Sequence, residues 1–266
     1  MPHIKQEIDL NLLNGMVDTD ELYLAWSEVP WDTAVFGSPV LQIDEIKIRG
    51  QGACSDIRGF ENSCEGLGVR LISCRLPYES LRESIFLEDI GFRFIEMLYQ
   101  PELKFSDSFS SMHDCHLTAA PAVAKDLPLI LDIAGVAFRN ERFQIDPRLP
   151  SSLGDKRYQN WVMASFSHPR QRLFILREGE VIVSFFITEI LADGTCYWHL
   201  NAIAPEFQGR GYGRRAWLTM MAQASKEGAT GVRSSFVARN YRVLNLYAKL
   251  GFRFPPPLMT FHWVRS

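Results

Sequence analysis

Three glycines fall within six consecutive residues of this 266-residue chain, between a run typical of a strand (196–203) and a run typical of a helix (214–226). Glycine lets the backbone approach a ligand closely and point several N–H groups at it. The helix that follows adds the positive end of its dipole. The chemistry predicted for this turn is binding of an anion such as pyrophosphate. Its residues are Gln208, Gly209, Arg210, Gly211, Tyr212 and Gly213.

The spacing separates this turn from two other phosphate-binding motifs. It is not the Gly-x-Gly-x-x-Gly of dinucleotide-binding folds, and no Lys-Ser/Thr pair follows it as in a P-loop. It reads Gln-x-x-Gly-x-Gly. A second pattern follows a strand-like run at 232–237, where Asn240 precedes Tyr247 by seven residues and Gly251-Phe252 comes next.

Together the two patterns resemble the acetyl-CoA loop and the following helix of the GCN5-related N-acetyltransferase (GNAT) superfamily. The run Leu200-Asn201-Ala202-Ile203-Ala204-Pro205 is similar to the Leu-x-Val-x-Pro that precedes the loop there. The resemblance implies an α+β fold with a mixed, mostly antiparallel sheet flanked by helices. It also implies an N-acetyltransferase that uses acetyl-CoA as cosubstrate.

The resemblance assigns binding roles to the loop and to the strand before it. Backbone amides of the turn Gln208–Gly213 would hold the pyrophosphate of acetyl-CoA, helped by Arg210, and Asn240 would bond to the pantetheine. The strand would pair with the pantetheine as if with an extra strand, and one of its N–H groups would face the thioester oxygen. The strand residues concerned are Asn201, Ala202 and Ile203.

Two side chains are the candidates for proton transfer. Tyr247 matches the superfamily's general acid, which would protonate the departing thiolate. His199 lies on the strand that supplies the base in several members, and an imidazole suits the deprotonation of an ammonium near neutral pH. Glu206 is an alternative base, and an amine that arrives uncharged would need none.

The two halves of the chain echo each other. Gly-Val-Arg at 68–70 is followed by Gly-Phe-Arg-Phe at 91–94, and the same two motifs recur at 231–233 and 251–254. The first glycines of the two motifs are 23 residues apart in the first copy and 20 in the second. The first copy lacks the glycine turn, and Pro77 and Phe86 stand roughly where the second has Asn240 and Tyr247.

We therefore predict a degenerate GNAT-like domain over 1–110, a polar linker over 105–113 and a catalytic GNAT domain over 115–266. The Trp-x-x-x-x-Phe-Gly stretch at 31–37 is similar to one in two-domain TDP-fucosamine acetyltransferase-like proteins.

The composition limits the classes of partner that this chain is expected to bind. The net charge of −3 favours neither nucleic acid nor an anionic membrane. Five scattered cysteines offer no zinc spacing, so no metal is expected. The longest apolar run, 127–138, is too short to span a bilayer, and the first residues lack the pattern of a signal peptide. A cytoplasmic enzyme is expected, with a homodimer left open.

The predicted reaction is acetyl transfer from acetyl-CoA to a primary amine of a small molecule, by direct attack in a ternary complex. A nucleotide-linked amino sugar is one candidate acceptor. Two alternatives remain open at this point: a protein or peptide N-acetyltransferase, and a non-catalytic sensor that binds acyl-CoA.

Overall fold

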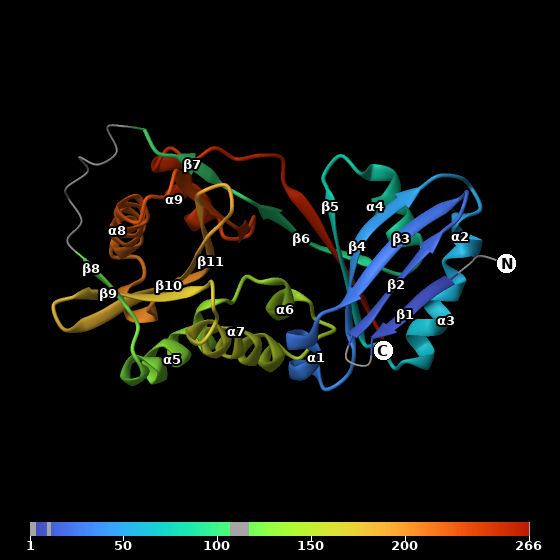
Figure 1. Cartoon of the computed structure of the whole chain (residues 1–266), viewed down its shortest axis with the longest axis horizontal. Helices are drawn as coiled ribbons and strands as arrows, with labels where there is room; N and C mark the ends of the chain where they lie inside the picture. Colours follow the sequence, from blue (N-terminus) through green and yellow to red (C-terminus); the bar gives the residue numbers. More distant parts are fainter. Residues whose placement is uncertain (1–3, 10–11, 107–116, 266) are drawn as a thin grey trace. The chain divides into compact units, whose positions relative to one another are not determined.

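The computed structural model describes residues 4–9, 12–106 and 117–265. They form two compact units, neither of which is contiguous in sequence (Figure 1). Unit 1 comprises Met1–Met97, Asp146–Leu153 and Pro256–Ser266, and unit 2 comprises Leu98–Ile145 and Gly154–Pro255. The sequence instead suggested contiguous domains over 1–110 and 115–266. Residues 107–113 of the expected linker, and also Cys115 and His116, lie outside the described residues.

Unit 1 is built on a mixed sheet with the strand order β1-β2-β3-β4-β5-β14-β6. Its strands are β1 (Ile4–Asp9), β2 (Leu12–Asp18), β3 (Leu22–Glu28), β4 (Val40–Ile48), β5 (Leu71–Pro77), β6 (Arg93–Tyr99) and β14 (Leu258–Val264). Its helices are α1 (Pro30–Phe36), α2 (Ala53–Asp56), α3 (Arg58–Gly66) and α4 (Leu81–Asp89). One hydrophobic core lies between the sheet and α2 to α4, where Trp26 packs on Phe60 with ring centroids 4.6 Å apart.

The last strand of the chain belongs to unit 1. β14 pairs antiparallel with β5 over seven residues. A buried cluster fastens it to the segment Asp146–Leu153: Nδ1 of His262 lies 3.0 Å from Oδ2 of Asp146, and Arg148 donates to both oxygens of the same carboxylate. Burial raises the pKa of Asp146, but the hydrogen bonds from His262 and Arg148 outweigh it and hold that pKa well below its usual range.

Unit 2 contains a sheet with the order β7-β12-β11-β10-β9-β8. The strands of unit 2 are β7 (Glu102–Lys104), β8 (Thr118–Pro121), β9 (Arg172–Glu178), β10 (Val181–Ile190), β11 (Thr195–Ile203), β12 (Gly231–Ser234) and β13 (Phe236–Val237). β13 pairs with Leu98 and Tyr99, the last two residues of β6, which lie in unit 2. Its helices are the 3₁₀ turns η2 (Ala124–Asp126) and η3 (Pro205–Phe207), with α5 (Leu127–Ala137), α6 (Arg142–Ile145), α7 (Ser151–Phe166), α8 (Tyr212–Lys226) and α9 (Tyr241–Lys249).

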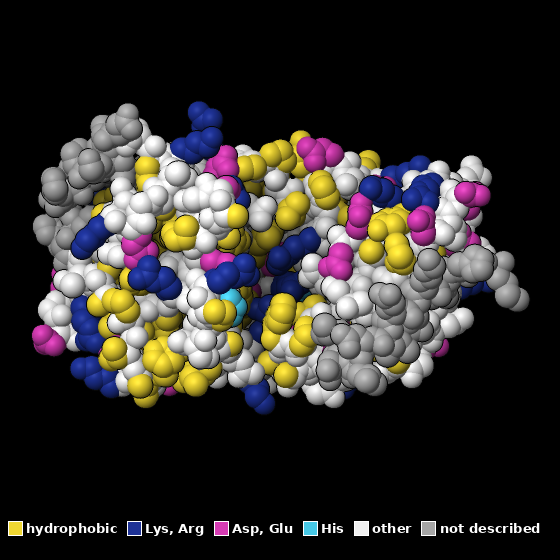
Figure 2. Space-filling view, in the orientation of Figure 1, with side chains coloured by type: hydrophobic (Ala, Val, Ile, Leu, Met, Phe, Trp, Pro, Cys, Tyr) yellow, Lys and Arg dark blue, Asp and Glu magenta, His cyan; other side chains and the backbone are white. Residues whose placement is uncertain are grey.

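Helices cover both faces of this sheet, as Figure 1 shows: α8 and α9 lie on one face, α5 and α7 on the other. Because successive side chains point to opposite faces of the sheet, each strand contributes to two hydrophobic cores. Phe174 and Phe186 belong to the α8–α9 core, whereas Ile175 and Phe185 belong to the α5–α7 core. On its outer side α5 exposes apolar side chains (Figure 2).

The predicted elements around the glycine turn are present. β11 spans the strand predicted at 196–203, and α8 begins two residues before the predicted helix at 214–226. The strand predicted at 232–237 is interrupted at Ser235, which divides it into β12 and β13. No helix in the described ranges is long and apolar enough to cross a membrane.

Candidate functional site

The turn between η3 and α8 depends on glycine at two positions. Gly209 and Gly211 have φ angles of +75° and +85°, a region that L side chains rarely adopt. Gly211 is the N-cap residue of α8, and no side chain of the described residues caps this helix end. The first-turn amides of a 15-residue helix are therefore left open to an external acceptor, as an anion site requires.

Some side chains of the turn are held by hydrogen bonds, whereas others are exposed to solvent. Tyr212 donates a hydrogen bond to the carboxylate of Glu178, and Nη2 of Arg215 lies 2.5 Å from Glu178 Oε1, so the β9–β10 hairpin holds both. Nε2 of Gln208 donates to the carbonyl of Ile203 at 2.9 Å, which anchors the turn to the end of β11. Arg210 is exposed. Gly213 is packed closely under α9, because a Cβ there would lie 3.3 Å from Leu246.

β11 separates from β12 partway along its length. The parallel pairing covers four residue pairs and ends at Trp198 with Ser234, whose hydroxyl donates to the Trp198 carbonyl at 3.1 Å. Beyond that point the register places Asn201, Ala202 and Ile203 against β10 alone. Among the described residues, no strand therefore pairs with the other backbone edge of β11 over the residues that the sequence assigned to pantetheine.

His199 is a β-bulge at the place where the two strands separate. In the β10–β11 ladder Thr188 pairs with Trp198 and Ile187 pairs with Leu200, so His199 has no partner across the ladder. The bulge changes which face the following side chains take. Trp198 lies in the α8–α9 core, whereas Leu200 lies in the α5–α7 core.

A buried carboxylate contacts the His199 ring. Nε2 of His199 lies 2.9 Å from Oε2 of Glu189 on β10, and the two side chains are 19% and 9% exposed. Arg170 contacts the other oxygen of Glu189 at 3.2 Å. Burial lowers the pKa of His199, and this effect outweighs the rise caused by Glu189, so the ring is held as the neutral base.

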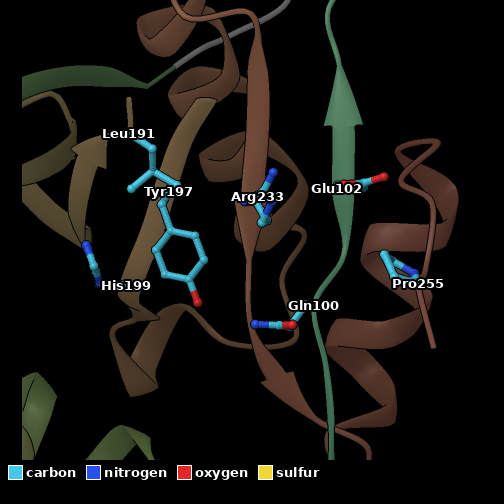
Figure 3. Close-up of a pocket in the computed structure, with 7 residues that line it drawn as sticks. All are labelled: Gln100, Glu102, Leu191, Tyr197, His199, Arg233 and Pro255. Carbon is cyan, nitrogen blue, oxygen red and sulfur yellow. The ribbon is translucent and has the colours of Figure 1, made fainter. Parts of the chain in front are cut away.

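A cavity of about 470 Å³ opens beside His199 (Figure 3). In Figure 3, Tyr197 projects from β11 between His199 and Gln100, and Arg233 comes from the neighbouring strand β12. The rings of Tyr197 and His199 are 4.8 Å apart. The lining residues, all from unit 2, are Gln100, Glu102, Leu191, Tyr197, His199, Arg233 and Pro255.

Tyr247 lies in the α8–α9 core. It is 1% exposed and stacks on Phe236 with ring centroids 5.3 Å apart. Burial raises its pKa to about 12, against a hydrogen bond with Ser234 that lowers it, so the hydroxyl stays protonated at neutral pH. Because Ser234 is the last residue that pairs with β11, this hydroxyl lies beside the point where the strands separate. His199 packs instead near Trp161 of α7, toward the other face of the sheet.

Two further predicted residues have defined positions. Asn240 is the N-cap of α9 and its Oδ1 accepts a hydrogen bond from the Val243 amide at 3.3 Å. Glu206, the alternative base, is exposed on η3. In the part of the chain that the structure describes, no group of three or more His, Cys, Asp or Glu side chains could hold a metal ion.

Sequence reasoning missed Glu189, Tyr197 as a cavity residue, and the bulge. All three depend on the register between β10 and β11, which no local pattern encodes. The available signal was a carboxylate, Glu189, in a strand that is mostly apolar.

The model of the acetyltransferase (GNAT) family matches residues 135–252. No curated protein matches the chain in sequence.

Solved structures resemble the whole chain in fold. A GCN5-related N-acetyltransferase from Sphaerobacter thermophilus is 13% identical, with a TM-score of 0.63 over 92% of this chain and 81% of that one. One from Kribbella flavida is 15% identical, with a TM-score of 0.58 over 99% and 90%. A tandem GNAT protein from the clavulanic acid biosynthesis pathway is 9% identical, with a TM-score of 0.60 over 95% and 82%. These likenesses confirm the predicted fold class, an α+β fold of mixed sheets flanked by helices.

Proposed function

We propose that this chain, an N-acetyltransferase whose residues 135–252 belong to the acetyltransferase (GNAT) family, transfers the acetyl group of acetyl-CoA to a primary amine of a small molecule. The observation that carries the proposal is the separation of β11 from β12. It leaves an unpaired backbone edge between the open amides at the start of α8 and the cavity beside His199. A thioester held along that edge would present its carbonyl to an amine in the cavity.

The residues present fit acetyl-CoA. The pyrophosphate would accept hydrogen bonds from the amides around Gly211, and Arg210 would add a charge-assisted contact. The pantetheine amides would pair with the free edge of β11 at Asn201–Ile203, and Asn240 stands at the start of α9 to bond to the same arm. An N–H of this edge would stabilise the oxyanion that forms on the thioester carbonyl.

The chain's own groups would move the protons. His199 takes one proton from the acceptor ammonium, and the lone pair of the neutral amine then forms the C–N bond to the thioester carbon. As the C–S bond breaks, its electron pair leaves on sulfur, which takes a proton from Tyr247. Tyr247 recovers the proton that the amide nitrogen loses, and His199 releases its own to solvent. One proton is released in each turnover.

Cavity size favours a small acceptor. About 470 Å³ accommodates one small molecule, such as an amino sugar with part of a nucleotide, and its lining offers both charge signs at Glu102 and Arg233. A protein or peptide amine is the alternative acceptor. A sensor that binds acyl-CoA without turnover would not need a hydroxyl with a high pKa at the strand separation, which Tyr247 supplies.

The test is consumption of acetyl-CoA by the full chain against a panel of amines: free and nucleotide-linked amino sugars, amino acids, polyamines and peptides. We expect turnover with at least one small amine and a kcat/KM for it above that of every peptide. Faster turnover of peptides would replace the small-molecule acceptor. Tight binding of acetyl-CoA without turnover of any amine would favour the sensor.

A further inference from the structure

Glu189 contacts the proposed base His199 and has no role in the chemistry described so far. It is itself buried and ends the buried run 182–189 of β10. A carboxylate in such a place is costly unless it is paired and hydrogen-bonded. Its two oxygens contact Nε2 of His199 and Nε of Arg170, at 2.9 and 3.2 Å.

The geometry specifies a tautomer for His199. A carboxylate accepts hydrogen bonds and does not donate them when ionised, so the ring must donate from Nε2. Neutral imidazole carries one N–H, so Nδ1 then holds the lone pair. Nδ1 forms no hydrogen bond with the described residues, and the His199 side chain lines the cavity.

We propose that Glu189 is a positioning residue for His199: it fixes the ring as the Nε2–H tautomer and makes Nδ1 the atom that takes the proton from the acceptor ammonium. This rests on the proposed function of His199 as the base. When Nδ1 is protonated, the ring becomes a cation that is hydrogen-bonded to the Glu189 carboxylate, and this carboxylate stabilises the cation. The same fixing of one ring nitrogen by a carboxylate on the other orients histidines in metal sites and catalytic triads.

Other charged groups around the ring modify this pair without replacing it. Arg170 is 76% exposed, so it contacts Glu189 from the solvent side and its charge is largely screened. Arg170 and His168 both lower the pKa of His199, whereas Glu189 raises it. The titratable or charged groups that face the ring or share its cavity are Glu189, Arg170, His168, Tyr197, Arg233 and Glu102.

The experiment compares Glu189→Gln with Glu189→Asp in the full chain. Since Glu189 raises the pKa of His199, its neutralisation in Glu189→Gln should lower that pKa and move the acidic limb of kcat/KM to lower pH. The plateau above the limb should fall about ten- to a hundredfold, because a less basic, unfixed ring accepts the proton less well. Glu189→Asp, which keeps the charge, should recover part of both changes.

A spectroscopic readout separates this inference from the proposed function. Nitrogen-15 NMR of labelled histidine should show Nε2 protonated and Nδ1 unprotonated in the neutral wild-type ring, with that preference lost in Glu189→Gln. Glu180→Gln, an exposed substitution at the turn before β10, is the matched control and should change neither the spectrum nor the rate profile.

A wild-type ring protonated at Nδ1 would overturn the proposal even if the enzyme is active. So would an active Glu189→Gln with an unchanged limb and plateau. If the wild type acetylates no amine, the proposed function fails, while the NMR titration still tests the pair: a His199 pKa that does not fall in Glu189→Gln would then overturn it.

Discussion

β4 in unit 1 and β11 in unit 2 are nine-residue strands with the same irregularity at the same place. Each pairs in parallel with the following strand over four residues, Val40–Ile43 with β5 and Thr195–Trp198 with β12. The next residue is a bulge against the preceding strand in both cases, Asp44 in unit 1 and His199 in unit 2. Each strand then leads through a turn with glycines into a helix.

The correspondence continues down the chain, with an offset of 155 residues between the two strands and of 160 residues from the following helix ends onward. Left-handed glycines end the helices at 68 and 228 and again at 91 and 251. These positions correct two of the matches between the halves of the chain that the sequence suggested. Gly68 matches Gly228 rather than Gly231, so both intervals are 23 residues and no insertion is needed. The helix caps align Ser80 with Asn240 and Leu87 with Tyr247, in place of Pro77 and Phe86.

The two units differ in what satisfies the open backbone. In unit 1 the Gly52 amide, at the helix end, donates to Glu21 at 2.7 Å, and the Ile48 amide, on the separated part of β4, donates to Glu83 at 3.3 Å. In unit 2 the hairpin carboxylate of Glu178 binds the side chains of Tyr212 and Arg215 and leaves the amides alone. In unit 1, carboxylates of the unit itself thus accept from these backbone amides, whereas in unit 2 the nearby carboxylate of Glu178 accepts from side chains.

A glycine turn and a separated strand therefore do not by themselves make a cofactor site. Leu87, which has no hydroxyl, stands at the position of Tyr247, so unit 1 also lacks the proposed general acid. We therefore expect one acetyl-CoA per chain, bound by unit 2.

The largest effect should come from Gly211→Glu. It forces a side chain into φ +85° and places a negative charge among the amides that would hold the pyrophosphate. We expect calorimetry to show acetyl-CoA affinity reduced at least about a hundredfold, the scale of losing several charge-assisted hydrogen bonds.

Gly228→Glu is the matched control for this variant. Gly228 follows the other end of α8, has φ +82° and has open space around it, so the backbone strain is similar. It should cost stability but spare acetyl-CoA affinity. Equal acetyl-CoA affinity in wild type and Gly211→Glu would show that the turn is not the site and would remove this difference between the units.

The second-largest effect is expected at Tyr247, whose counterpart in unit 1 is Leu87. Tyr247→Phe removes only the hydroxyl, which stays protonated near neutral pH because its pKa is about 12. If that proton goes to the thiolate, kcat should fall roughly ten- to a thousandfold with acetyl-CoA affinity nearly unchanged. Tyr99→Phe is the control, since Tyr99 also stacks on Phe236. An unaltered kcat, with the chemical step limiting, would leave Tyr247 only a packing role.

The features of this site that depend on residues close together in the sequence could be predicted from it. Glycines with positive φ, the start of α8 and the cap at Asn240 follow from residue types at fixed spacings. Nonlocal features could not be read in the same way. The bulge at His199 depends on cross-strand register, its contact with Glu189 joins residues ten apart on two strands, and β14 pairs with a strand some 190 residues earlier. Ladder partners like these are chosen by tertiary packing.

The smallest effect is the one that tests unit 1 directly. Glu21→Ala removes the carboxylate that accepts from the Gly52 amide. Hydrogen bonds to charged groups contribute about 1.5–3 kcal/mol, so the free energy of unfolding of unit 1 should fall by roughly that amount. Glu45→Ala, which breaks an exposed pair with Lys47 on β4, should change it far less, because solvent screens exposed ion pairs.

Denaturant unfolding measures both variants, and calorimetry with acetyl-CoA decides what Glu21→Ala means. Opening the turn still leaves Glu83 on the separated strand and Leu87 in place of the tyrosine, and α2 is a helix of only four residues with little dipole. The number of acetyl-CoA sites should therefore remain one. A second site appearing in Glu21→Ala, absent from Glu45→Ala, would show that a single carboxylate had closed a working site, and the contrast between the units would reduce to that side chain.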